Sequence, residues 1–176
     1  MLIYNSTVIP VMQNLLLPTD NSIVTFEFLK QLKVKVTFNS VKEAIHTHPN
    51  YPSLLSNSDS LKKWNIESTA LKVPLNHFEE LPLPFLTFLK KNGRQFILVT
   101  EMKNESIRYI DTQGIKKWIT RDYFLQKWES VVLLAEGGIT SGEANYKVAR
   151  RNEVIKKLHL IIIIHTSLFQ DLLPLF

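Results

Sequence analysis

Side chains that could do chemistry are few in this chain of 176 residues, and cysteine is missing altogether. Without cysteine there is no thiolate nucleophile, disulfide, thiolate zinc site or iron–sulfur cluster. One carboxylate stands in a defined motif: Asp111, in the turn sequence Asp-Thr-Gln-Gly. An aspartate at a strand end commonly bonds its own backbone, so a turn role and a site role are both open for it.

Two histidines, His46 and His48, are separated by one residue at the expected end of a helix. Side chains two apart on a helix do not share a face, so we expect no metal site here. The glycines within residues 137–142 are not accompanied by the lysine of a phosphate-binding loop. The sequence therefore predicts neither a metal nor any other cofactor.

The net charge of +5 raises nucleic acid or an anionic membrane as partners. Residues 147–157 contain five basic side chains and one acidic one, whereas residues 1–146 carry a balance of only +2. A domain so evenly charged, with no platform of basic and aromatic residues, is not expected to bind nucleic acid. The positive charge is instead concentrated just before the end of the chain.

Residues 158–176 follow this basic cluster directly and are almost entirely apolar, with Asp171 as their one formal charge. A bilayer-spanning helix needs about 20 such residues, and Asp171 and Pro174 weaken this one. Two interpretations stay open: a membrane-entering segment, or a terminal helix packed on the domain. The first places the domain on the cytoplasmic face of the membrane, because basic residues favour that side, and the second makes the protein cytoplasmic.

The spacing of apolar residues changes from a helical to a strand period along the chain. Three helices are expected: residues 23–32 with Asp20 or Asn21 as N-cap, a short helix that Ser40 begins and His48 ends, and residues 53–64 closed by Asn65. Strands are expected over residues 69–73, 84–89, 96–100, 107–110, 116–119 and 131–134, with short helices at 77–81 and 121–128.

Helices followed by a meandering sheet indicate an α+β fold, with the N-terminal helices packed on a mainly antiparallel sheet. We expect a domain over residues 1–136 and a Gly/Ser linker over 137–146. The basic segment and the apolar helix then occupy 147–176.

Three stretches carry a resemblance to a known family. They are HPNYPSLLSNSDSLKKWNIESTALKV at residues 48–73, QFILVTEMKNESIRYIDTQGIKKW at 95–118 and FLQKWESVVLLAE at 124–136. In order and spacing they resemble the papain-like cysteine peptidase domain that precedes bacteriocin-exporting ABC transporters and cleaves leader peptides after a double glycine. The resemblance spans about residues 12–136 and implies a papain-like fold.

In that family a cysteine opens the first long helix, a histidine begins a strand of the form His-Phe-Val-Val-Leu, and an aspartate ends the next strand. The matching positions here are Asp20 or Asn21, then Gln95, then Asp111. Gln95 cannot exchange a proton near neutral pH, and the neighbouring Ser22 has no base to activate it. The resemblance therefore implies a catalytically inactive member of the family, not an enzyme.

An inactive domain of this kind is expected to act as a membrane-adjacent module that binds a peptide or protein partner, possibly during peptide export. Candidate contacts are Tyr51, Leu54, Gln95 and Phe96. Tyr51 and Leu54, like the three tryptophans, are expected first to be core residues, with peptide contact as the alternative.

A second interpretation rests on residues 48–64, which also resemble cysteine-less versions of this domain found ahead of a membrane thiol oxidoreductase of the vitamin K epoxide reductase type. The chain would then be the accessory N-terminal domain, or a fragment, of a larger enzyme. It cannot be the oxidoreductase by itself, because the redox cysteine pairs are missing.

Overall fold

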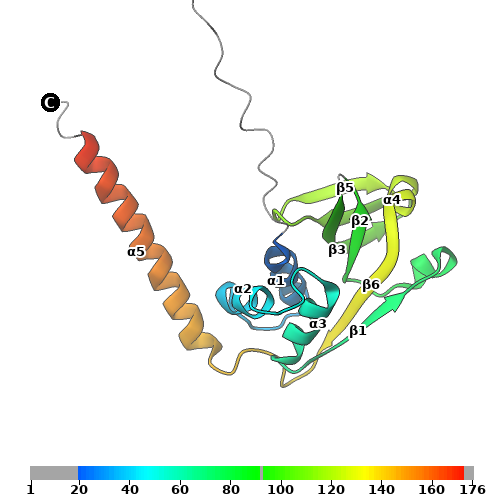
Figure 1. The fold of residues 1–176 in the computed structure, drawn as a ribbon, viewed down its shortest axis with the longest axis horizontal. Coiled ribbons are helices and arrows are strands. Elements are labelled where there is room, and N and C mark those ends of the chain that lie inside the picture. The colour runs from blue at the N-terminus through cyan, green and yellow to red at the C-terminus, as the bar shows by residue number, and fades with distance from the viewer. Residues whose placement is uncertain (1–19, 92, 173–176) are drawn as a thin grey trace, which may run out of the picture.

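The computed structural model describes residues 20–91 and 93–172 of the chain. The elements follow in the order α1 (Asn21–Gln31), α2 (Phe38–His46), α3 (Leu54–Lys62), β1 (Ile66–Lys72), the 3-10 helix η1 (Leu75–Glu80), β2 (Phe85–Lys90), β3 (Arg94–Lys103), β4 (Ser106–Ile110), β5 (Lys116–Thr120), α4 (Arg121–Lys127), β6 (Trp128–Gly137) and α5 (Tyr146–Leu172). Figure 1 shows α1, α2 and α3 gathered beside a curved sheet, and α5 leading away from them.

The six strands form one sheet in the order β1-β6-β2-β3-β4-β5, and every neighbouring pair is antiparallel. The predicted α+β architecture is confirmed. The last strand, β6, lies between β1 and β2, so the C-terminal strand of the domain occupies an interior position in the sheet. Strand β6 is longer than the expected 131–134 because β2 pairs with its first part, up to Leu133, and β1 pairs with its second part, from Val131 to Gly137.

Each face of the sheet has its own apolar core. On the first face, α1, α2 and α3 bury Val24, Phe28 and Ile45 against sheet residues that include Phe96 and Leu98. On the second face, η1 and α4 cover the sheet through Phe78 and Phe124, joined by Trp128 and others. Alternating strand residues supply the two cores in turn.

Side-chain caps fix the starts of the first three helices. Asp20 caps α1 as expected, and Ser53 forms a capping box with Ser56 at the start of α3. The second helix begins earlier than predicted. Its cap is Thr37, whose hydroxyl accepts the Ser40 N–H at 3.4 Å, so Ser40 lies inside the first turn.

Residues 138–145 are fastened to the helical layer, whereas a linker was expected over 137–146. The N–H of Gly142 donates to Trp64 O at 3.0 Å, and the N–H of Glu143 donates to Lys35 O at 2.9 Å. Gly142 has φ +137°, and a Cβ there would lie 3.1 Å from the Lys35 carbonyl, so this close backbone crossing requires glycine.

Helix α5 departs from both expectations for the end of the chain. Within the described ranges, no helix is long and apolar enough to cross a membrane, which corrects the membrane-spanning interpretation of 158–176 as far as residue 172. Residues 173–176 lie outside the described part. Nor does the apolar run pack on the domain: the side chains from Leu160 to Ile164 are between 51% and 61% exposed.

Candidate functional site

The start of α1 is the position at which a nucleophile was sought. Asn21 is the first helical residue, is 2% exposed, and its Oδ1 has no hydrogen-bond partner among the described residues. Ser22, the next residue, is fully buried. Asp20 is therefore the cap and Asn21 the first residue of the helix, and these are the two positions expected to match the helix-opening cysteine of the resembled family.

Asp20 joins this position to α2 and to the loop after it. Its Oδ1 lies 2.9 Å from His46 Nε2 and 2.9 Å from Ser22 N, and the Ser22 hydroxyl also donates to it. Partial burial acts to raise the pKa of Asp20, but the bonds from Ser22 and His46 outweigh it and hold this pKa below its ordinary value. The ring centroids of Tyr51 and His46 lie 4.7 Å apart, so Tyr51 belongs to the same cluster.

This arrangement contains serine, histidine and aspartate, but it is not a nucleophile–base pair. In a catalytic triad the histidine sits between the serine and the carboxylate, and takes the serine proton. Here the carboxylate of Asp20 sits between the other two, so the hydroxyl of Ser22 donates to a carboxylate and not to His46. The cluster can order the start of α1, but it cannot generate a serine alkoxide.

Asp111 ends β4 and holds the turn that follows. Its Oδ1 accepts the N–H groups of Gln113 at 3.0 Å and Ile115 at 2.9 Å, and its Oδ2 lies 2.5 Å from Lys117 Nζ. Burial acts to raise the pKa of Asp111, but the bonds from Lys117, Ile115 and Gln113 outweigh it and the pKa lies below its ordinary value. These contacts support the turn role of Asp111, because all the groups that bond to its side chain belong to the turn or to β5.

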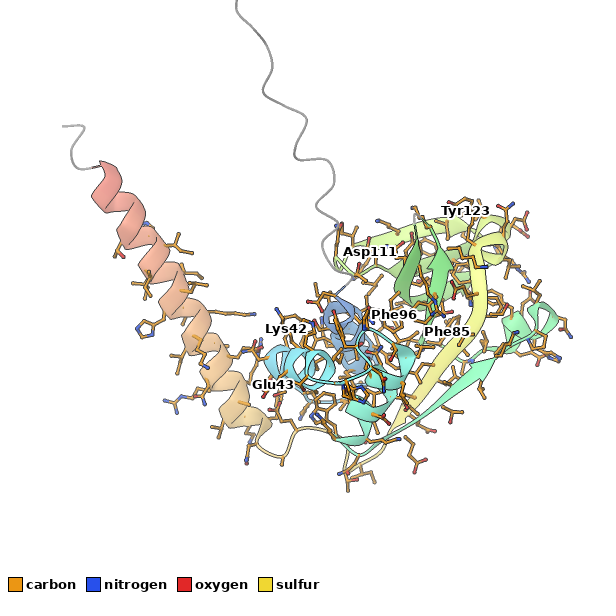
Figure 2. The ribbon with its side chains drawn as sticks, in the orientation of Figure 1. Lys42, Glu43, Phe85, Phe96, Asp111 and Tyr123 are labelled. Atoms are coloured by element: carbon orange, nitrogen blue, oxygen red, sulfur yellow. The ribbon has the colours of Figure 1, made fainter. Side chains whose placement is uncertain are left out.

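The turn of Asp111 packs on the start of α1. A Cβ on Gly114 would lie 3.3 Å from Ile23 Cγ2, two residues after Asn21. Figure 2 accordingly shows Asp111 at the end of the sheet close to α1, with Tyr123 at the opposite end. The fold thus brings the aspartate position and the expected nucleophile position onto adjoining segments.

Gln95 and Phe96, at the start of β3, differ in accessibility. Gln95 is half-buried and pairs with Leu89 of β2, and its side chain makes no hydrogen bond within the described residues. Phe96 is 1% exposed and belongs to the core under the helices, as its position in Figure 2 shows. Phe96 is therefore a packing residue and not a peptide contact, because a ligand could not reach its side chain without opening the core.

The remaining aromatic and apolar candidates divide in the same way. Tyr51 and Leu54 are half-buried against the first core, so each presents part of its side chain to solvent. Trp64 and Trp128 lie in the cores as expected, but Trp118 is 50% exposed on the edge strand β5. The core assignment of Trp118 was wrong because Ile119, the next residue of β5, faces the second core, so Trp118 points to the opposite face of the sheet and is left exposed there.

Sequence reasoning missed a pocket of about 470 Å³ beside the β3–β4 hairpin. Phe78, Leu81, Leu83, Met102 and Ile107 form its apolar wall, and Glu79, Asn104, Ser106 and Arg121 form its polar rim. An ion pair between Arg121 and Glu79 bridges that rim. The residues of this pocket come from four separate elements and the loops beside them, so no local sequence motif predicts the pocket.

Across the described ranges, no group of three or more His, Asp or Glu side chains is arranged to hold a metal ion. His46 Nε2 lies 2.9 Å from Asp20 Oδ1, whereas His48 Nε2 lies 3.3 Å from Asp59 Oδ2. The two rings therefore serve separate surface contacts.

Comparison with known proteins identifies relatives of this architecture. The model of the peptidase C39 family matches residues 26–138. The matched segment begins five residues after Asn21, so it includes the positions of Gln95 and Asp111 but not the start of α1. A search of curated proteins gave no match.

Solved structures share the fold at low sequence identity. The peptidase domain of Streptococcus ComA, a bi-functional ABC transporter of a quorum-sensing pathway, superimposes with a TM-score of 0.59 at 16% identity, over 68% of this chain and 93% of that one. A double-glycine-motif protease from an AMS/PCAT transporter, solved with its leader peptide, gives 0.59 at 14% identity, over 74% and 91%. The peptidase C39-like domain of a toxin-secretion ATP-binding protein from Vibrio parahaemolyticus gives 0.51 at 12%, over 69% and 97%.

Proposed function

This chain belongs to the peptidase C39 family, and from that premise we propose that it binds peptides without cleaving them. The observation that carries the proposal is the start of α1, where Asp20, Asn21 and Ser22 occupy the expected nucleophile region and Asp20 accepts capping bonds from Ser22. The sequence holds no cysteine anywhere, so no other residue could supply the thiolate. Gln95 stands at the position of the base and cannot take up a proton.

The peptide-binding half of the proposal is supported by the pocket beside the β3–β4 hairpin. Its wall is apolar and its rim carries Arg121 and Glu79, a combination suited to one large apolar peptide side chain with polar neighbours. The related protease from the AMS/PCAT transporter was solved with its leader peptide. We assign a peptide of that class, and its anchoring apolar residue, to this pocket. Gln95, Tyr51 and Leu54 stay candidate contacts nearer α1.

The test uses the full chain and a synthetic leader-type peptide that contains a double glycine. Fluorescence anisotropy of the labelled peptide should show saturable binding at micromolar protein, and mass spectrometry should find the peptide intact after prolonged incubation. Absence of binding at high micromolar concentration would overturn the binding half. Cleavage after the double glycine would overturn the inactive half.

A matched pair of variants locates the peptide. Leu83 lines the pocket and is 40% exposed, whereas Leu75 is 59% exposed and is not among the residues that line it. Leu83→Ala should weaken binding about tenfold, because burying a leucine side chain is worth roughly 1.5–3 kcal/mol. Leu75→Ala should leave the affinity unchanged. Equal effects of the two would place the peptide elsewhere.

The accessory-domain interpretation makes a different prediction. If the chain is the N-terminal part of a membrane thiol oxidoreductase, the native protein extracted from cells should have an intact mass well above 20.4 kDa. A native mass near 20.4 kDa would favour an independent peptide-binding module. We place either form at the cytoplasmic face of the membrane.

A further inference from the structure

A second concave site lies between the end of α1 and the start of α5, two segments that are far apart in the sequence. It has a volume of about 500 Å³. The residues that line it are Phe26, Lys30, Lys33, Val34, Lys35, Val36, Phe38, Tyr146, Arg150 and Lys157. Half of these ten side chains are cationic, and all of the others are aromatic or aliphatic.

Few carboxylates neutralise this groove. Glu27 pairs with Lys30 at 2.7 Å, and Glu153 pairs with Arg150 at 2.6 Å. Lys33, Lys35 and Lys157, the other three cations of the lining, have no carboxylate within 4.0 Å among the described residues. Three positive charges are therefore left to interact with an anion from outside the molecule.

The floor of the groove is apolar and partly exposed. Phe26 and Phe38 meet edge to face with their ring centroids 5.5 Å apart, and Lys30 Nζ lies 5.7 Å from the Phe26 centroid. Both rings are half-buried, as is Tyr146. The site therefore combines half-buried aromatic side chains with five cationic ones.

Two carboxylates, one in α5 and one in the segment before it, hold the start of α5 beside the groove. Glu153 is 2% exposed and accepts the N–H of Asn39 in the first turn of α2 at 3.1 Å. Glu143 accepts the N–H of Thr37 at 2.9 Å and the hydroxyl of Ser40 at 2.7 Å. Since α2 has no acidic residue in its own first turn, these two carboxylates complement the positive end of its dipole.

An exposed apolar surface continues from the groove along α5. Directly after Lys157, the last lining residue, come Leu158 and the run Leu160–Ile164, all more than half exposed. In Figure 1 this part of α5 extends away from the domain. The cationic groove and the apolar run of α5 are therefore continuous along the molecule. A bilayer presents its charged headgroups and its acyl chains in the same order.

We propose that the α1–α5 groove and the apolar run of α5 dock this protein on a membrane surface rich in anionic lipids. Lys33, Lys35 and Lys157 receive the lipid phosphates, and the apolar side chains of α5 enter the boundary between headgroups and acyl chains. The charge of the groove and its continuity with the apolar run favour a lipid surface. A nucleic acid would match the charge but would leave the isoleucines in water. This inference does not depend on peptide binding.

The experiment is co-sedimentation of the full chain with vesicles of neutral phosphatidylcholine alone or mixed with phosphatidylglycerol. Binding should require phosphatidylglycerol and should weaken as salt is raised. The variant Lys33→Gln with Lys35→Gln should lower the partition coefficient roughly 30-fold, because each basic residue at an anionic surface contributes about a factor of five. The matched control is Lys90→Gln with Lys91→Gln, which removes the same charge at a distant hairpin and should bind as the wild type does.

Several outcomes would overturn the proposal. Equal binding to neutral vesicles would mean that the apolar run acts without the groove, and equal loss in both double variants would mean a diffuse charge effect. No binding to either vesicle would reject the docking surface outright. A single-stranded oligonucleotide that binds through Lys33 and Lys35 while vesicles do not would assign the groove to nucleic acid. Circular dichroism of each variant verifies that it is folded.

Discussion

Asp20 Oδ1 and His46 Nε2 lie 2.9 Å apart, so the cap of α1 is tied to the last residue of α2. The same carboxylate accepts the backbone and hydroxyl protons of Ser22. One side chain therefore links the start of α1 to the end of α2, in the region where the nucleophile was expected. If the proposed function is right, a structural network stands where related peptidases hold a reactive group.

This network should make stability depend on acid pH. Because the folded-state pKa of Asp20 is lowered, its contribution is present above the ordinary aspartate pKa and is lost as pH falls through the folded value. We expect Asp20→Asn to reduce the free energy of unfolding by about 1 kcal/mol at neutral pH, and this difference to shrink as pH falls below the ordinary aspartate pKa. Urea unfolding of both proteins between pH 3 and 7 measures this.

A second substitution separates the charge from the cap. Asparagine caps a helix nearly as well as aspartate, whereas alanine does not, so Asp20→Ala should cost about a further 1 kcal/mol that does not depend on pH. Equal losses in Asp20→Asn and Asp20→Ala would mean that the cap contributes nothing, and a pH-independent loss in Asp20→Asn would mean that the charge of the carboxylate contributes nothing.

The match between Asn21, Gln95 and the family's catalytic pair can be tested by restoring the chemistry. Asn21→Cys alone should leave a double-glycine leader peptide intact, because no base is present at position 95. Asn21→Cys combined with Gln95→His should give slow cleavage, detected by mass spectrometry. The control is Asp20→Cys with Gln95→His, which places the thiol on the cap and should be inactive. Cleavage by the control, or by Asn21→Cys alone, would show that the positions are misassigned.

Asp111 should be a stability residue. Replacing it by alanine leaves the N–H groups of Gln113 and Ile115 and the ammonium of Lys117 without their acceptor, at a cost of about 2–3 kcal/mol. Asp122→Ala removes an exposed carboxylate of α4 and should change the free energy of unfolding by no more than about 0.5 kcal/mol. Chemical denaturation distinguishes the two, and a small loss at Asp111 would leave its buried bonds without an energetic role.

Glu153 should hold α5 on the domain. In Glu153→Ala, Asn39 N–H and Arg150 lose their buried partner, so the first turns of α5 should exchange their amide protons faster while the sheet stays protected. Hydrogen–deuterium exchange followed by mass spectrometry resolves these segments. Glu136→Ala, at an exposed site on β6, is the comparison and should leave α5 unchanged. Unaltered exchange in Glu153→Ala would mean that other contacts position this helix.

Local sequence determined the order and type of nearly every element. The helical period of residues 23–32 and 53–64, and the short β-rich runs after residue 66, were enough to predict an α+β chain. These patterns reflect steric and capping preferences within a few residues. The third helix ends at Lys62, earlier than expected, and Asn65, with φ 54°, ends the turn that follows it. The missing cysteine was equally a fact of the sequence alone, and it limits the chemistry whatever the fold.

The tertiary structure alone decided which of these residues meet. Glu153 looked like one charge in a solvated basic segment, yet it is buried on α2. Trp118 looked like core, yet it lies on an open edge. The groove that unites Lys33 with Lys157 depends on where α5 docks, and the Asp111 turn reaches α1 only through the strand order. Such contacts join residues up to 114 positions apart, so no local period encodes them.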